Sequence, residues 1–146
     1  MFKKRQKGLY MATVTRFEDL EAWQKARILA KEIFSLSRET ALGKDFRFRD
    51  QINAASGSVL SNIAEGFERG GRLEFINFLS IAKGSCGEVR SQLHQCLDRD
   101  YINDEEFTKL YNLAIDVGNL LGSWIRYLNN SEQKGTKFKN RVNGKL

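Results

Sequence analysis

Residues 61–80 read SNIAEGFERGGRLEFINFLS, and they contain the clearest sign of how the chain folds. Its first half places apolar residues three and four positions apart and then reaches Gly66, which indicates a helix close to its end. Gly70 and Gly71 follow, and glycine is the residue that most readily ends a helix in the left-handed conformation. Apolar spacing resumes at Phe75 and Phe78. The stretch therefore predicts one helix, a short turn and a second helix.

The same helical spacing extends in both directions from this turn. It predicts a first helix that opens between Thr15 and Asp19 and ends near Thr40, followed by helices at about 45–67, 72–100 and 103–130. The chain contains no proline, which favours long uninterrupted helices. Helices of similar length joined by short turns predict an all-α fold, an antiparallel up-down-up-down four-helix bundle.

Two helix starts carry capping patterns. Thr15-Arg16-Phe17-Glu18 matches the capping box S/T-x-x-E, in which the first and fourth residues hydrogen-bond each other's backbone. Asn103 is a good N-cap residue, and three acidic residues follow it in the first turn, where they suit the positive end of the helix dipole. The two patterns predict the beginnings of the first and fourth helices.

Small residues line a second face of the predicted helices. The third helix contains Gly84 and Gly87, and the fourth contains Gly118 and Gly122. A glycine inside a helix costs about 1 kcal/mol relative to alanine. Close contact with another helix, in this chain or in a partner, is the expected compensation. We therefore expect Gly84→Leu or Gly118→Leu to disrupt packing or assembly.

The charge of the chain is unevenly distributed over three predicted segments. Of 146 residues, 1–16 form a basic N-terminal arm with a charge of +5, and 131–146 form a basic, disordered tail with a charge of +4. The bundle itself, 17–130, has a charge of −3. No run of 18 apolar residues and no signal-peptide apolar segment are present, so no membrane association is expected and a cytoplasmic location is predicted.

The residues needed for catalysis are sparse. Cys86 and Cys96 lie about 15 Å apart if they share one helix, which is too far for a disulfide, and we expect both to be buried and reduced. The chain has one histidine, His94, which lies off the apolar stripe and is expected to be exposed. No phosphate-binding glycine loop is present. The sequence predicts a non-enzymatic protein without a cofactor, a metal or catalytic residues.

Several motifs in order resemble a known family. They are Phe17-Glu18-Asp19-Leu20 with Trp23-Gln24-Lys25-Ala26, then SNIAEG at 61–66, then Glu74-Phe75 with Phe78-Leu79, then Ala82-Lys83-Gly84-Ser85 with Glu88. The chain resembles the bacterial four-helix-bundle family, also called the 23S rRNA intervening-sequence protein family. Two departures are Leu60 and Ala41-Leu42, at places where the family often has proline.

The resemblance implies a ring-like homopentamer, and nucleic-acid binding is the activity usually suggested for the family. The fold is also similar to the accessory protein of diversity-generating retroelements, a basic pentamer that works with a reverse transcriptase. Residues expected to shape the fold or an interface are Trp23, Ser61, Asn62, Glu65, Gly66, Phe75, Phe78, Gly84, Ser85, Glu88, Gly118 and Gly122.

Two hypotheses for function follow. The first is RNA or DNA binding through basic surface residues, with these candidates: Lys3, Lys4, Arg5, Lys7, Arg47, Arg49, Arg69, Arg72, Lys83, Arg90, Lys137, Lys139 and Arg141. The second is a protein-interaction scaffold or an accessory subunit, for example of a reverse transcriptase. Asn62 and Glu65 lie three residues apart and form either a recognition or catalytic pair, or a polar network at the turn that Arg69 or Arg72 completes.

Overall fold

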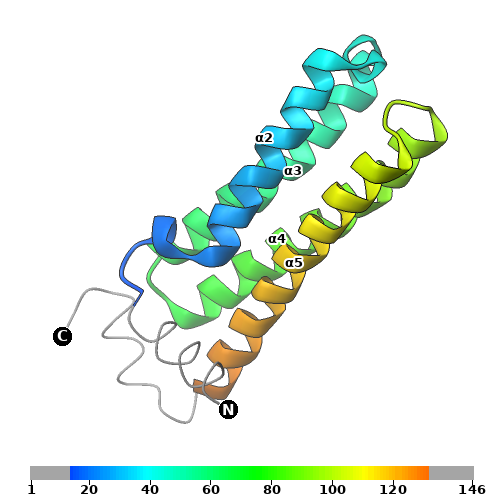
Figure 1. The fold of residues 1–146 in the computed structure, drawn as a ribbon. Coiled ribbons are helices and arrows are strands. Elements are labelled where there is room, and N and C mark those ends of the chain that lie inside the picture. The colour runs from blue at the N-terminus through cyan, green and yellow to red at the C-terminus, as the bar shows by residue number, and fades with distance from the viewer. Residues whose placement is uncertain (1–13, 132–146) are drawn as a thin grey trace.

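The computed structural model describes residues 14–131, and these residues form an all-α fold of four long helices (Figure 1). The helices are α2 (Glu21–Glu39), α3 (Phe46–Glu68), α4 (Arg72–Asp98) and α5 (Asp104–Asn130). Two short 3-10 helices, η1 (Phe17–Asp19) and η2 (Ala41–Lys44), precede α2 and α3. α2 and α4 each pack against both α3 and α5, which makes a bundle. No strand occurs within residues 14–131.

The ends of the helices confirm one predicted cap and correct the other. Asn103 forms a capping box: its side chain accepts from Glu106 N at 2.8 Å, and its own N–H donates to Glu106 Oε1 at 3.1 Å. The capping box predicted from Thr15 does not form, because Phe17–Asp19 adopts a separate 3-10 turn. α2 begins only at Glu21, with Leu20 at its N-cap position and no side-chain cap.

Each of the two turns that follow α3 and α4 contains a residue in the left-handed backbone conformation. Gly70 has a φ of 78° and closes the turn after α3, as the glycine pair predicted. Asp100, with a φ of 59°, closes the turn after α4, which is a position that glycine more often occupies. Tyr101 N donates to Cys96 O at 2.9 Å and Asp100 N to Leu97 O at 3.1 Å, the pair of bonds of a Schellman motif.

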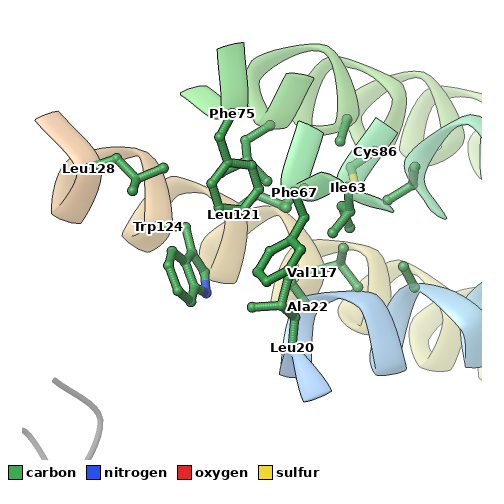
Figure 2. Packing of buried hydrophobic residues seen from close by; sticks show 14 residues of the cluster. Leu20, Ala22, Ile63, Phe67, Phe75, Cys86, Val117, Leu121, Trp124 and Leu128 are labelled. Atoms are coloured by element: carbon green, nitrogen blue, oxygen red, sulfur yellow. The ribbon is translucent and has the colours of Figure 1, made fainter. Parts of the chain in front are cut away.

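One half of the core is built around aromatic rings (Figure 2). Phe75 packs edge-on against Phe67 with 5.8 Å between ring centroids, and its ring lies 5.9 Å from that of Trp124. Phe78 Cβ would lie only 2.5 Å from a Cβ added to Gly66. Glycine at this position therefore lets the first turns of α4 approach the last turn of α3.

The other half of the core is aliphatic and lies toward η2 and the turn between α4 and α5. Its fully buried side chains include Ile33, Ile52, Leu93 and Leu110. Phe34 is apolar and yet 55% exposed. Ala22, Ala26, Leu29 and Ile33 face the core, and Phe34 follows Ile33 directly, about 100° further around the axis of α2.

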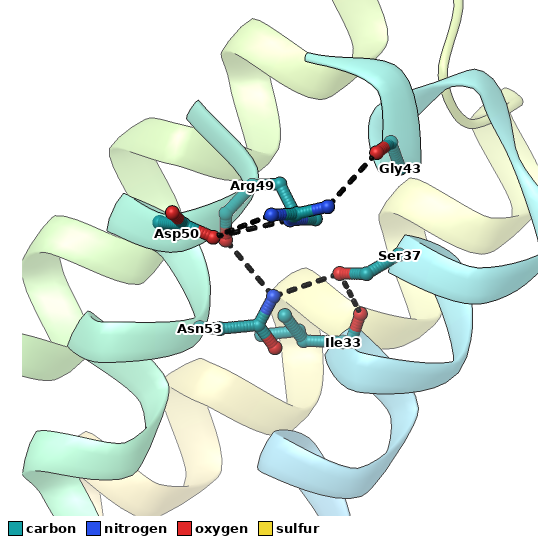
Figure 3. A network of polar contacts seen from close by, with 6 residues as sticks. All are labelled: Ile33, Ser37, Gly43, Arg49, Asp50 and Asn53. Atoms are coloured by element: carbon teal, nitrogen blue, oxygen red, sulfur yellow. Dashed lines mark hydrogen bonds and ion pairs between the residues drawn. The ribbon is translucent and has the colours of Figure 1, made fainter. Parts of the chain in front are cut away.

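A polar network joins α2, η2 and the start of α3 (Figure 3). Asn53 Nδ2 donates to Ser37 Oγ at 2.8 Å, and Ser37 Oγ donates to Ile33 O at 3.2 Å. Arg49 Nη1 donates to Gly43 O at 3.1 Å. A Cβ on Gly43 would lie 2.2 Å from Ser37 O, so only glycine fits at this position. The network fixes the first helix–helix connection.

The structure confirms the prediction for the two cysteines. Cys86 and Cys96 both lie on α4, buried and free, as predicted.

The arm and the tail lie almost wholly outside the described residues. The same is true of the candidate residues Lys3, Lys4, Arg5, Lys7, Lys137, Lys139 and Arg141. Residue 14, assigned to the flexible arm, packs against the core. Among the described helices, none combines the length and apolar character needed to cross a membrane.

Candidate nucleic-acid interface

Three of the arginines predicted to face outward are engaged within the fold. Arg72 is buried, and its Nη1 donates to Leu128 O at 3.2 Å, so the prediction that it is a surface residue available to nucleic acid is wrong. A buried guanidinium needs such acceptors, and the carbonyls at the C-terminus of a helix supply them. Arg69 pairs with Glu65 at 2.8 Å, and Arg49 with Asp50 at 3.1 Å. Arg47 is exposed.

Asn62 and Glu65 have separate partners. Asn62 Nδ2 donates to Ser58 O at 2.8 Å and to Ser58 Oγ at 2.9 Å. Ser58 Oγ in turn lies 3.0 Å from Ser85 Oγ, which links α3 to α4. Glu65 is half exposed and accepts from Arg69, whose guanidinium also lies 5.3 Å from the centroid of the Phe78 ring. Glu65 and Arg69 therefore form a polar contact beside the turn between α3 and α4, whereas Asn62 belongs to a separate link between the middle parts of these two helices.

Lys83 and Arg126 come together on the surface between α4 and α5. Lys83 Nζ and Arg126 Nη1 lie 3.8 Å and 3.5 Å from the point where a Cβ on Gly122 would stand. Two cations that converge on one point repel each other unless an anion lies between them. Within residues 14–131, no carboxylate forms an ion pair with either of them. This arrangement fits a phosphate group.

Aromatic rings continue this surface along the same two helices. The Arg90 guanidinium lies 5.9 Å from the centroid of the Tyr111 ring. Tyr111 stacks on Phe107 at 5.1 Å, and His94 packs against both rings at 5.4 Å and 4.9 Å. His94 is exposed, as predicted, but it contributes to this aromatic group. We name the surface formed by Lys83, Arg90, His94, Phe107, Tyr111, Gly122 and Arg126 the α4–α5 strip.

Three glycines inside the helices, Gly84, Gly87 and Gly118, do not serve close packing within the chain. A Cβ on Gly84 or Gly118 would meet no heavy atom within 4 Å, and one on Gly87 would meet only Arg90 Nη2 at 3.9 Å. The alternative of contact within this chain is therefore wrong for these positions. Their backbone instead lies open on the surface, where another molecule can approach it closely.

The remaining predicted residues lie in several places. Trp23 is half-buried and packs edge-on against Phe17 at 5.2 Å. Ser61 is exposed, and Glu88 accepts a hydrogen bond from Gln92 Nε2 at 3.4 Å. The sequence reasoning missed Arg126, because nothing in one helix reveals that its guanidinium meets Lys83 of another. It also missed Arg27 and Lys31, although they follow Trp23 at intervals of four residues on one helix face.

Comparisons with known proteins agree with the fold. A model of the family described as 23S rRNA-intervening sequence protein matches residues 18–123. The chain is similar to a solved structure from Bacteroides thetaiotaomicron, a protein of unknown function from the S23 ribosomal protein family. The two are 28% identical with a TM-score of 0.66, and the match covers 71% of this chain and 97% of that chain. No curated protein matches. This chain therefore belongs to the 23S rRNA-intervening sequence protein family.

Proposed function

We propose that this protein is a non-enzymatic, oligomeric helical bundle that binds nucleic acid, with RNA as its principal ligand. The observation that carries the proposal is the convergence of Lys83 and Arg126 over Gly122, where no carboxylate of residues 14–131 forms an ion pair with either cation. The family description, which names 23S rRNA, supports RNA as the ligand. The cytoplasm, where ribosomal RNA resides, is the proposed location.

The α4–α5 strip combines the elements that single-stranded nucleic acid requires. Lys83, Arg90 and Arg126 supply positive charge for phosphates. Tyr111 and Phe107 are half-buried and supply ring surface on which a base can stack. Contacts of these kinds depend on the backbone and on stacking, so we expect binding with little sequence preference.

Oligomerisation would multiply this surface. We propose an antiparallel up-down-up-down course for the helices and a ring of identical copies, with the pentamer as the expected size. The link from Asp45 to Arg99 and Tyr101 supports the antiparallel course, because it holds the α2–α3 and α4–α5 connections at one end of the bundle. Each copy would contribute one α4–α5 strip, and several strips on one assembly would raise the apparent affinity for a long strand.

An anisotropy titration with labelled single-stranded RNA tests this function. We expect affinity to fall steeply with salt, because each neutralised phosphate contributes about 0.7 to the logarithmic salt slope. The double variant Lys83→Ala/Arg126→Ala should weaken binding and reduce the slope by about 1–2. Lys44→Ala/Arg38→Ala removes the same charge from exposed positions outside the strip and serves as the matched control.

Two results would contradict the assignment. Absence of RNA and DNA binding at low salt would exclude nucleic acid as the ligand. Equal loss of affinity in the strip variant and the control variant would show that only overall charge matters. A variant with Lys3, Lys4, Arg5 and Lys7 replaced by alanine measures the share of binding that belongs to the N-terminal residues.

A protein-interaction scaffold is the second candidate, including an accessory subunit of an enzyme such as a reverse transcriptase. The open backbone at Gly84 favours it, because a Cβ there would meet no atom of this chain within 4 Å. A helix of another protein could approach that position closely. Capture of a specific partner after nuclease treatment would support this function, whereas partners that disappear with the nucleic acid would favour RNA binding.

A further inference from the structure

A groove runs between α3 and α4, and its lining alternates small side chains with longer polar ones. It follows two turns of α3 from Gln51 to Ser58 and two turns of α4 from Glu88 to Gln95. Ala54 and Ser91 are exposed on its two sides. We name this surface the α3–α4 groove. Short side chains on both sides leave room for larger side chains of a docking helix, as when ridges pack into grooves.

The amide of Gln92 is incompletely satisfied beside this groove. Gln92 lines the groove and is only 6% exposed. Its Nε2 donates to Glu88 at 3.4 Å, while its Oε1 is buried with no hydrogen-bond partner among the described residues. Buried polar atoms are nearly always paired in folded proteins. Rotation of the Gln92 side chain would turn this acceptor into the groove, where an incoming molecule would supply the donor that it lacks.

Large apolar side chains and cations are exposed together on the outer face of α2. Ile28 is 50% exposed and Phe34 is 55% exposed. Arg27 and Lys31 are exposed between them, and no carboxylate among the described residues pairs with either cation. We name Arg27, Ile28, Lys31 and Phe34 the α2 ridge. It covers two helical turns, which is the length of the groove.

We propose that the α2 ridge of one copy docks into the α3–α4 groove of a second copy, an inference that rests on the oligomer proposed above. In this contact Ile28 and Phe34 would lie over the small side chains of the groove, which are Ala54, Ala55, Ser58 and Ser91. The two surfaces also match in charge. Glu88 is the one charged side chain that lines the groove, and Arg27 and Lys31 are cations on the ridge. Arg27 or Lys31 would also bring the donor that Gln92 Oε1 lacks.

The geometry of this contact decides the kind of assembly. The ridge lies on α2, whereas the groove lies between α3 and α4, so each copy presents two different surfaces. Such a head-to-tail contact continues from copy to copy and closes into a ring when the rotation allows it. The contact leaves the α4–α5 strip uncovered, so assembly and nucleic-acid binding can occur together.

A mixing experiment tests the contact directly. Ile28→Asp damages the ridge and keeps the groove, while Ser91→Trp fills the groove and keeps the ridge. Each variant alone should be a monomer in light scattering or sedimentation. An equimolar mixture should form a dimer, because one intact ridge meets one intact groove and neither copy can extend further. Phe46→Asp introduces the same charge at an exposed apolar position outside both surfaces and should keep the wild-type size.

Charge reversal gives a second, independent measurement. Arg27→Glu and Glu88→Arg should each reduce assembly, and the double variant should restore it. The inference is overturned if the wild-type protein is monomeric at every concentration, if either single variant keeps the wild-type size, or if the mixture stays monomeric. Lys83→Ala/Arg126→Ala should leave the size unchanged, so failure of RNA binding and failure of the docking contact are distinguished.

Discussion

The Tyr101 hydroxyl donates a hydrogen bond to Asp45 Oδ2 at 2.6 Å and thereby ties the α4–α5 turn to the residue that precedes α3. Arg99 Nη1 donates to the same oxygen at 2.9 Å, and its guanidinium lies 4.6 Å from the centroid of the Phe48 ring. These residues are more than fifty positions from Asp45 in the sequence. The contact connects two helix–helix turns that only the fold brings together.

The Asp45 contact should make stability depend on pH. The Tyr101 hydrogen bond, followed by the hydrogen bond and charge of Arg99, lowers the pKa of Asp45. A lowered pKa in the folded state means that the ionised carboxylate stabilises the fold above the unfolded-state pKa, about 3.9. This contribution is lost as the pH falls through the lower folded-state pKa. Asp45→Asn should therefore lower the free energy of unfolding at neutral pH, and the difference from wild type should shrink toward about pH 3.

Urea unfolding at a series of pH values measures this difference. Asp98→Asn changes an exposed carboxylate on α4 and is the matched control. A gap between wild type and Asp45→Asn that stays constant from neutral to acid pH would show that the carboxylate charge has no role in the contact.

Substitution by alanine should change the free energy of unfolding in opposite directions at Gly66 and Gly57. Both lie in α3, but a Cβ on Gly66 would lie 2.5 Å from Phe78 Cβ and 3.2 Å from Phe75 Cδ2, whereas one on Gly57 would meet nothing within 4 Å. Gly66→Ala should lower the free energy of unfolding by about 1–3 kcal/mol, because α4 must move away. Gly57→Ala should raise it by about 0.5–1 kcal/mol through helix propensity. Thermal unfolding of both variants and the wild type at one fixed protein concentration checks both signs, and destabilisation by both substitutions would refute the assignment.

The two thiols should be inert in the native protein. Burial raises the pKa of Cys86 to about 12 and that of Cys96 to about 11, so the reactive thiolate is scarce at neutral pH. Labelling by a maleimide should therefore proceed only as fast as the protein opens, and rapidly in urea. A free-thiol peptide at the same concentration gives the unhindered rate. Fast labelling of the folded protein at either cysteine would contradict the buried position.

Phe75 should be among the most costly side chains to truncate. It is 1% exposed and lies between the rings of Phe67 and Trp124. Phe75→Ala should lower the free energy of unfolding by about 3–5 kcal/mol, because it leaves a cavity and removes two ring contacts. Phe46→Ala, at a side chain that is 65% exposed, should change it by less than about 0.5 kcal/mol. Chemical unfolding of the two variants provides the comparison, and equal losses would refute this view of the core.

The number and the approximate bounds of the helices could be predicted from the amino-acid sequence. Apolar residues three and four positions apart report which side of a helix is buried, and Gly70 and Asn103 mark ends through local backbone chemistry. The same local logic failed at Thr15, where the chain forms a 3-10 turn that packs against α3. A local pattern cannot report a contact with a distant helix, and this contact decided where α2 begins.

Which polar residues come together on the surface depends on how the helices pack against one another. Arg72 and Lys83 are both basic residues of α4, yet one is buried against the Leu128 carbonyl and the other meets Arg126 over Gly122. In the same way, nothing in the spacing of Gly66 and Gly84 reveals that the first touches Phe78 and the second faces open space. Helical periodicity gives the direction in which a side chain points around the axis of its helix. What that side chain meets depends on the rotation and distance of the neighbouring helices, which packing of the whole core fixes.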